Sequence, residues 1–273
     1  MQFFIFLLAA LVSGVTVLSL IRKHYDKKVN AVWKALQIRN ESGEVFSQEM
    51  AEGLPMPAKQ WLLHAIEPGR QLARRVEITL TGAIKLGDKG RWIPFEAIQI
   101  IAAGKGFVWK AKVRISCFVN LEGADYYFNR EGRVHFSLFG LIPAVNVSGT
   151  AVAKSAAGRV LLESCFLPTA FLPNRGAKWE GIDSLHARAI LSVDELSAAI
   201  TMTYNQDGSL KELVMPRHRG NENGNTAPFG AAVGEEKNFE GFTIPSKLSA
   251  GWWYGTDKYR EFFRAEIRTA RFY

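Results

Sequence analysis

The polar residues best placed to do chemistry are Arg159, Glu163 and Arg188. Arg159 and Glu163 lie four residues apart in a mostly apolar stretch. If that stretch is a strand they share one face, because four residues are two full periods. Arg188 follows Asp183 on a second predicted strand. A carboxylate among apolar neighbours needs a partner, and arginine offers a bidentate one. The group is therefore either a polar anchor for a ligand headgroup or, as is more frequent, a structural ion pair that closes the sheet.

Acidic residues also allow a catalytic hypothesis. Asp125, Glu163 and Asp183 can supply a general acid and a general base, the minimum for glycoside or other hydrolysis. Their spacing does not require this role, since acidic residues are common at strand ends. The sequence has no nucleophile elbow, phosphate-binding loop, His-Glu-x-x-His motif or dinucleotide fingerprint. A hydrolase or transferase that uses carboxylates near Glu163 and Asp183 is therefore the alternative hypothesis.

Histidine and cysteine give no evidence of a metal site. The five histidines show no ligand spacing with one another or with the two cysteines, so neither a metal nor another cofactor is predicted. Cys117 and Cys165 fall in apparent strands with apolar neighbours. That setting favours two buried free thiols, although one disulfide is the other option if the domain faces an oxidising compartment.

Large aromatic residues are numerous in the strand-rich part of the chain. Such rings either line a pocket for an apolar ligand or, more often, fill the core. The set comprises Trp92, Phe95, Phe107, Trp109, Trp179, Trp252 and Trp253. We predict that Trp109 and Trp179 contact a ligand, together with Arg159, Glu163, Asp183 and Arg188.

A period-two alternation of apolar and polar residues begins at Ala73 and returns many times toward residue 273. Such segments predict β-strands. Turn sequences separate them, and Asn205-Gln206-Asp207-Gly208 is a good hairpin signal. Many strands joined by short turns, with helices mostly early, predict an α+β fold that is mainly antiparallel β. We expect a curved sheet or half-barrel closed by helices.

Several segments interrupt this pattern. Helices are predicted after Leu54-Pro55-Met56-Pro57 and over residues 94–103, where a proline opens each. Residues 159–166 form either a helix or a strand that breaks at Pro168. The polar, Gly/Asn-rich residues 217–238 predict a long mobile loop. Residues 241–245 predict an edge strand halted by Pro245.

The N-terminal segment carries no charge over residues 1–21, and Arg22, Lys23, Lys27 and Lys28 follow. At about 1.5 Å rise per residue, such a helix spans roughly 30 Å, the thickness of a bilayer core. We therefore predict a transmembrane anchor over 1–22, with residues 2–21 in the bilayer, and a single-pass protein of the cell membrane. A cleaved signal peptide is the competing interpretation, but the run is too long and lacks a basic start. The basic flank favours a cytoplasmic domain and leaves the face undecided.

The remaining chain divides into a juxtamembrane helix and linker over 23–45 and one strand-rich domain over 46–273. Its net charge of +8 and isoelectric point near 9.5 suggest either attraction to anionic partners or a generally basic surface. Lysine and arginine are scattered and do not form a basic-aromatic strand face. No nucleic-acid partner is therefore predicted.

Several short motifs follow one another in a recognisable order over residues 50–273. They are Leu54-Pro55-x-Pro57, Trp92-x-Pro94-Phe95-x-Ala97-x-Gln99, Gly106-Phe107-x-Trp109-x-Ala111, Arg159-x-Leu161-x-Glu163, Pro168-Thr169-Ala170, Trp179-x-x-Ile182-Asp183, Ala187-Arg188-Ala189 and Gly241-Phe242-x-Ile244-Pro245. The combination resembles an uncharacterised bacterial family of unknown function, which implies no catalytic residues. The strand-rich domain is also distantly similar to lipoprotein-carrier half-barrels, a likeness that implies a cavity for a hydrophobic ligand.

The main hypothesis is a membrane-anchored module that binds a lipid or another apolar small molecule without catalysis. The alternatives are the carboxylate-dependent enzyme above and a structural partner in a membrane complex that makes contact through the 217–238 loop.

Overall fold

A computed structural model of the chain describes residues 2–37, 43–87, 90–221 and 223–273. Its main feature is one sheet of thirteen strands in which all neighbours run antiparallel. The strands are β1 Arg75–Lys85, β2 Trp92–Ala102, β3 Gly106–Arg114, β4 Asn120–Phe128, β5 Glu131–Leu138, β6 Ile142–Ser148, β7 Lys178–Gly181, β8 His186–Val193, β9 Leu196–Tyr204, β10 Leu210–His218, β11 Thr226–Phe239, β12 Phe242–Trp252 and β13 Arg260–Phe272.

The strand order explains how the chain builds the site. The sheet reads β6-β5-β4-β3-β2-β1-β13-β12-β11-β10-β9-β8-β7, so one meander runs outward from β1 and a second returns to it. Pairing of β1 with β13 joins the two meanders in the middle. The chain leaves β6 at one edge and must reach β7 at the other. Residues 149–177, which lie between β6 and β7 in the chain and are all described, make that crossing.

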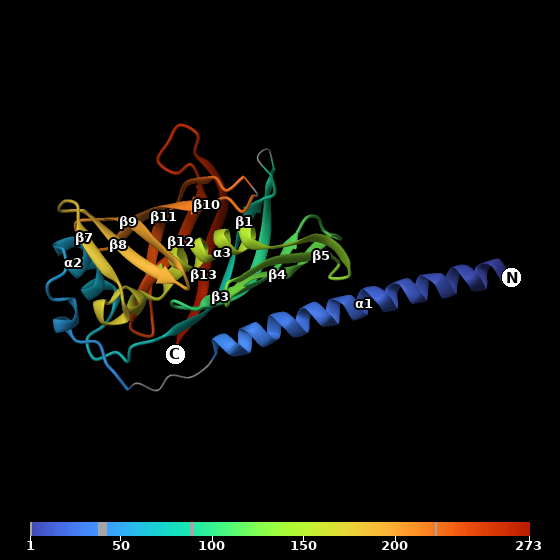
Figure 1. The fold of residues 1–273 in the computed structure, drawn as a ribbon, viewed down its shortest axis with the longest axis horizontal. Coiled ribbons are helices and arrows are strands. Elements are labelled where there is room, and N and C mark those ends of the chain that lie inside the picture. Colours follow the sequence, from blue (N-terminus) through green and yellow to red (C-terminus); the bar gives the residue numbers. More distant parts are fainter. Residues whose placement is uncertain (1, 38–42, 88–89, 222) are drawn as a thin grey trace.

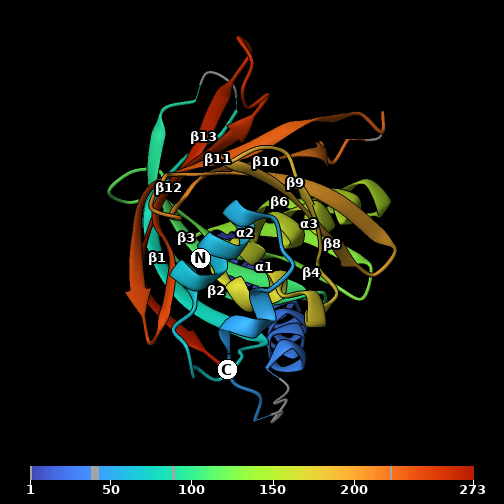
Figure 2. The same cartoon turned by 90° about the vertical axis from the view of Figure 1, so that its left-hand side faces the viewer.

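The crossing segment contains α3, Thr150–Glu163, followed by short 3-10 helices over Ser164–Phe166, Pro168–Phe171 and Pro173–Arg175. Figure 2 shows the sheet curling around this segment and around α2, Met56–Ala65, which lie on its concave side. Helix α3 buries Val160, Leu161 and Leu162, and α2 buries Trp61 and Leu62. These side chains join the inward-facing strand residues in one large core. The predicted fold class, mainly antiparallel β with a few helices, is confirmed, and the sheet is curved and open.

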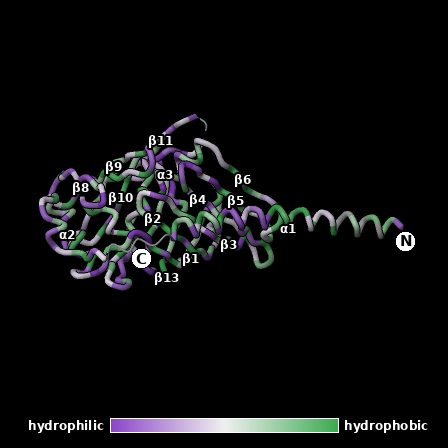
Figure 3. Tube along the Cα trace, turned by 60° about the horizontal axis from the view of Figure 1, so that its bottom comes forward, coloured by the Kyte–Doolittle hydropathy of each residue, from purple (hydrophilic) through white to green (hydrophobic). Residues whose placement is uncertain are grey.

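Hydrophobic and hydrophilic residues alternate along much of the strand trace (Figure 3). This is the pattern of a sheet packed on one face. The other face is covered in part by α1, Gln2–Leu36, whose buried residues Val29, Val32 and Leu36 pack on Ile100 and Val108. The first half of α1 projects away from the sheet (Figure 1). A short 3-10 helix over Gln48–Ala51 precedes α2.

The membrane prediction is corrected by these helices. Within the described part of the chain, none has the length and apolar character needed to cross a bilayer. The prediction of a single-pass protein of the cell membrane, anchored through residues 1–22, is therefore wrong, and nothing in the described structure supports the predicted bilayer contact of residues 2–21. Helix α1 does not end at the basic residues after position 21 but continues to Leu36 and packs on the sheet. Residues 38–42 of the predicted linker lie outside the described residues.

The predicted helix over residues 94–103 is also wrong, because this segment belongs to β2. Ile93, Phe95 and Ala97 are buried, whereas Pro94 and Glu96 are exposed, which is a period of two. From Gln99 onward residues on both faces are buried, because α1 covers the outer face at Ile100. Pro94 precedes the β2–β3 ladder, which begins at Phe95, so its missing N–H removes no bond to β3.

Two predictions in the C-terminal part are wrong because small residues and prolines there lie within strands. Residues 217–238 are not a long loop, since β10 extends to His218 and β11 begins at Thr226. Residues 241–245 are not an edge strand, since β12 lies between β11 and β13. Pro245 is tolerated there because it pairs where the β11–β12 register shifts and before the β12–β13 ladder begins at Lys247. Small residues and prolines thus mark irregular strands here, not their ends.

The helix predicted after Leu54-Pro55-Met56-Pro57 is confirmed as α2, and the hairpin at 205–208 joins β9 to β10 as expected. Residues 159–166 are helical: they belong to α3 and the 3-10 turn that follows, and no strand forms there. Both cysteines are free, but only Cys165 is buried, because Cys117 lies in the exposed turn between β3 and β4.

Candidate functional site in the cavity beneath α3

A cavity of about 210 Å³ remains between α3 and the inner face of the sheet. We call it the inner cavity. Most of its wall is apolar, and four of its lining residues carry charge: Asp125, Arg159, Glu163 and Arg217. The apolar wall comes from both meanders and from α3. It includes Leu80, Ile84, Leu162, Phe166, Leu213, Ala231, Leu248, Phe263 and Ile267.

Arg159 organises the charged end of the inner cavity. Its Nε donates to Glu163 Oε1 at 2.6 Å, and its Nη1 donates to Asp125 Oδ2 at 2.6 Å. Glu163 also accepts a 2.5 Å hydrogen bond from Gln99 Nε2. Gln99 is itself buried, at 2% exposed. We call these four residues the Arg159 cluster. The predicted shared face of Arg159 and Glu163 is confirmed, although it arises from i, i+4 spacing on a helix and not from a strand.

Aromatic rings on β3 hold the arginine in place. The Arg159 guanidinium carbon lies 4.5 Å from the ring centre of Phe107 and 5.4 Å from that of Trp109. These are distances at which a cation is attracted to an aromatic face. Trp109 and Asp125 are register partners on β3 and β4, so their side chains project from the same place on the sheet. Sheet register, and not sequence proximity, therefore brings the carboxylate to the arginine.

A second arginine, Arg217 from β10, lies on the same cavity wall. Its Nε donates to the Ser155 carbonyl on α3 at 3.0 Å, and its guanidinium lies 4.5 Å from the ring centre of Phe229. Gly158 makes room for it, because a Cβ there would lie 3.0 Å from Arg217 Cγ. Sequence analysis missed this residue by assigning it to a loop. The sequence held one sign of its position: Arg217 follows the alternating run 210–215 by two residues, so an extension of that strand would include it.

Burial shifts the ionisation of these groups. It raises the pKa of the Asp125 carboxyl to about 6, although the positive charge of Arg159 opposes the rise. Burial lowers the pKa of Arg217 to about 10, and the charge of Arg159 adds to that effect. Burial also opposes the charge on Arg159, but Asp125 and Glu163 outweigh it and raise the pKa of that arginine. At neutral pH Asp125 is thus mostly charged, as are Arg159 and Arg217.

Two buried polar atoms at this end have no hydrogen-bond partner within the described residues. They are Asp125 Oδ1, an acceptor, and Trp109 Nε1, a donor. Buried polar atoms are almost always paired, so each unpaired one calls for an explanation. Because Trp109 and Asp125 are cross-strand partners, the two atoms belong to neighbouring side chains. A group that both donates and accepts a hydrogen bond would satisfy them together.

Three predicted site residues lie elsewhere. Arg188 on β8 pairs with Glu180 of β7 at 3.1 Å, and both side chains are about half exposed. Asp183 lies in the exposed turn between β7 and β8, where it accepts hydrogen bonds from the backbone and ring of His186. Trp179 donates to the Phe171 carbonyl at 2.9 Å. The structure therefore brings together Arg159, Glu163 and Trp109, while Asp183 is not paired with Glu163.

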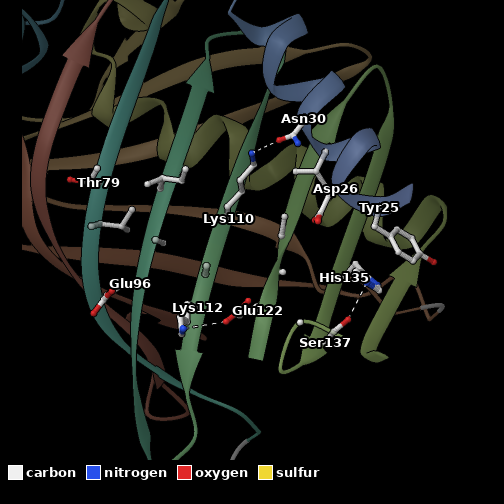
Figure 4. A pocket seen from close by; sticks show the side chains of 18 of the residues that line it. Tyr25, Asp26, Asn30, Thr79, Glu96, Lys110, Lys112, Glu122, His135 and Ser137 are labelled. Atoms are coloured by element: carbon white, nitrogen blue, oxygen red, sulfur yellow. Dashed lines mark hydrogen bonds and ion pairs between the residues drawn. The ribbon is translucent and has the colours of Figure 1, made fainter. Parts of the chain in front are cut away.

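A larger, open groove lies on the other face of the sheet, between α1 and strands β1–β5 (Figure 4). Its volume is about 810 Å³. Its charged side chains largely bond one another or the helix: Lys110 donates to Asn30 at 2.7 Å, and Lys112 lies 3.2 Å from Glu122. Most of these polar groups already have partners, and the buried His135 Nδ1 lacks one within the described residues. The inner cavity differs in holding an unpaired donor and an unpaired acceptor on neighbouring side chains. We therefore take the inner cavity as the candidate site. Among the residues that the structure describes, no three His, Cys, Asp or Glu side chains are grouped to hold a metal ion.

Comparison with known proteins gives one family match and several fold matches. Three solved structures share 8% sequence identity with the chain. A DUF1329 family protein from Desulfovibrio piger has a TM-score of 0.41 and covers 82% of this chain and 91% of its own. A LolA superfamily protein from Nitrosomonas europaea has a TM-score of 0.39, with 80% and 92% covered. A putative outer membrane lipoprotein-sorting protein domain from Vibrio parahaemolyticus has a TM-score of 0.40, with 81% and 93% covered.

None of the curated proteins compared with the chain matches it in sequence. A family profile, described as a family of unknown function (DUF6920), matches residues 52–272. This range agrees with the segment over which the short motifs resemble an uncharacterised family. Since the match spans most of the sequence, the chain belongs to the DUF6920 family of unknown function.

Proposed function

We propose that the protein binds a small apolar molecule with a neutral hydroxyl-like polar group in the inner cavity. One observation carries the proposal: an apolar cavity ends at a buried acceptor, Asp125 Oδ1, and a buried donor, Trp109 Nε1, which lack partners within the described residues. A pocket with an apolar wall and a few convergent polar groups is the usual form of a small-molecule site.

The cavity volume limits the size of the ligand. An engineered cavity of about 150 Å³ holds benzene, and pockets for drug-sized ligands start at about 300 Å³. At about 210 Å³, the inner cavity suits a molecule somewhat larger than benzene, such as a chain of about eight carbons. This supports a short acyl or alkyl chain, or one such segment of a lipid, as the bound group.

The charges of the cavity wall favour a neutral polar end. Arg159 already binds two carboxylates, and Arg217 is held by the Ser155 carbonyl. A ligand carboxylate would add a third negative charge beside Asp125 and Glu163, in a place where charge is poorly solvated. A hydroxyl adds none: it donates to Asp125 Oδ1 and accepts from Trp109 Nε1.

The test is isothermal titration of the full chain with 1-octanol and with octanoate. Burial of about seven methylenes at roughly 0.8 kcal/mol each gives about 6 kcal/mol, so octanol should bind with a Kd between about 10 μM and 1 mM. Octanoate should bind at least about tenfold more weakly at neutral pH. Native mass spectrometry of the gently purified chain adds a direct search for a retained ligand.

Neighbouring residues on β11 provide a matched pair of variants. Ala231 is buried and lines the inner cavity, whereas Ala232 is partly exposed on the other face. Ala231→Leu should fill the cavity and abolish octanol binding, and Ala232→Leu should leave it unchanged. Octanol that fails to bind the wild type, or that binds both variants equally well, would refute the proposal.

A further inference from the structure

A second pocket, of about 230 Å³, lies where several connecting segments meet outside the inner cavity. We call it the basic pocket. It is bounded by the start of β1, the β2–β3 turn, the end of α3 and the 3-10 helices after it. Four cationic side chains line it, and the lining contains no aspartate or glutamate: Arg74, Arg75, Lys105 and Arg175. This composition is distinct from that of the inner cavity, in which positive and negative side chains balance.

Arg75 is the most buried of these cations, at 8% exposed. Its Nη1 donates to the Gln37 carbonyl at 2.8 Å, and its guanidinium lies 4.2 Å from the ring centre of Tyr273. These contacts fix the side chain against the pocket wall. Its Nε has no hydrogen-bond partner among the described residues, and the nearest carboxylate oxygen, on Glu77, is 3.8 Å away. The Arg75 Nε–H is therefore a fixed, buried donor that could donate a hydrogen bond to an acceptor atom of a ligand.

Arg175 presents a second donor of the same kind. Its Nη2 donates to Glu44 at 2.8 Å, whereas its buried Nε lacks a partner within the described residues. Burial and the nearby charge of Arg74 lower the pKa of Arg175. Repulsion between cations that share a pocket is relieved when an anion binds between them. Two arginines from distant parts of the sequence thus line one pocket, and each carries a donor without a partner in the described residues.

Lys105 lies at the exposed mouth of the basic pocket, in the β2–β3 turn. No ion pair joins it to a carboxylate in the part of the chain that the structure describes. Three hydroxyls on the wall already donate elsewhere: Ser164 to the Val160 carbonyl, Thr169 to the Ala73 carbonyl and Ser192 to the Ser197 hydroxyl. The pocket therefore offers charge and N–H donors from its basic side chains, which suits an oxyanion rather than a neutral polar molecule.

We propose that the basic pocket binds a phosphoryl group. A tetrahedral oxyanion can accept hydrogen bonds from donors on several sides, as the two Nε groups and the lysine require. At about 230 Å³ the pocket has room for several waters at roughly 30 Å³ each, and so for one phosphoryl group with its immediate substituent. The group comes either from free phosphate or from the headgroup of a phospholipid, and these two sources share the same recognition chemistry.

The experiment titrates the full chain with inorganic phosphate and with dihexanoyl phosphatidate at constant ionic strength. Binding of phosphate alone with the higher affinity identifies the free anion as the ligand. Binding of the phosphatidate at least about tenfold more tightly identifies a lipid headgroup. Absence of saturable binding of both overturns the proposal.

Lys105→Glu is the informative variant, because this lysine is exposed and its replacement removes no contact of the core. Reversal of one charge at the pocket mouth should weaken phosphoryl binding at least about tenfold. Lys211→Glu changes the net charge of the protein equally at an exposed position on β10, outside the pocket, and should have little effect. Equal weakening by both variants would show attraction to the overall positive charge only and would also overturn the proposal.

Two further variants separate this site from the inner cavity. Lys105→Arg keeps the charge and should keep most of the affinity for phosphate. Ala231→Leu should abolish octanol binding and leave phosphate binding intact. Either proposal can therefore fail while the other stands.

Discussion

The ionisation of Asp125 gives the most direct test of how the Arg159 cluster is built. Its carboxyl has a pKa of about 6 in the folded protein and an ordinary value of 3.8, because burial disfavours the charged form. The folded state therefore binds the proton more tightly than the unfolded state. This contribution stabilises the protein as the pH falls through 6, and it is absent well above pH 6.

The magnitude follows from the two pKa values. A difference of about two units corresponds to roughly 3 kcal/mol once the carboxyl is protonated in both states. At about pH 4.5 only the folded-state carboxyl is fully protonated, and the contribution there is roughly 2 kcal/mol. An amide at this position has no such proton to bind. The free energy of unfolding of the wild type, relative to that of Asp125→Asn, should therefore rise by about 2 kcal/mol between about pH 7.5 and pH 4.5.

The assay is urea unfolding of both proteins at the two pH values and constant ionic strength. Asp183→Asn serves as the control, because the pKa of the exposed Asp183 is lowered by hydrogen bonds from the Leu185 backbone and from His186. The stabilising contribution of Asp183 is lost only when the pH falls to the lowered pKa of its carboxyl in the folded protein. This contribution therefore changes little above about pH 4.5. If the free energy of unfolding of the wild type and that of Asp125→Asn change equally with pH, burial does not raise the pKa of the Asp125 carboxyl and the reasoning fails.

Three other predictions follow from the packing of α3 and from the thiols. Arg159→Met should destabilise the protein by about 3–5 kcal/mol in urea unfolding, because it leaves two partly buried carboxylates without their cation; a loss below about 1 kcal/mol would show that the cluster is well solvated. Gly132→Ala should lower stability by at least about 1–3 kcal/mol, since its Cβ would lie 2.5 Å from the Cα of Ala153 on α3, whereas an unchanged melting temperature would mean that α3 can shift. The exposed Cys117 should react with a thiol reagent in the native protein, while Cys165 should react only on unfolding because burial raises its pKa; simultaneous modification of both thiols would contradict the structure.

The sequence by itself determined the strand-rich class, most strand positions and the shared face of Arg159 and Glu163. Period-two alternation marks a sheet with one packed face, and this signal is local. The Arg159–Glu163 relation held although the segment is a helix, because residues four apart are neighbours on a helix and also share a face on a strand. Where both faces are covered, as at Ile100 beneath α1, the alternation disappears and β2 was mistaken for a helix.

Tertiary structure alone decided which residues join Arg159 and Glu163 at the inner cavity. Asp125 arrives through its register with Trp109, Gln99 through the strand β2, and Arg217 from the second meander, more than fifty residues along the chain from α3. No local pattern records these neighbours, because they depend on the pairing of β1 with β13 and on the passage of α3 beneath the sheet. The same strand order places Arg188 and Asp183 near the β7 edge of the sheet, away from Arg159. Ordering along the chain fixes which side chains share a face of one element, whereas the meeting of distant elements depends on the whole set of strand pairings.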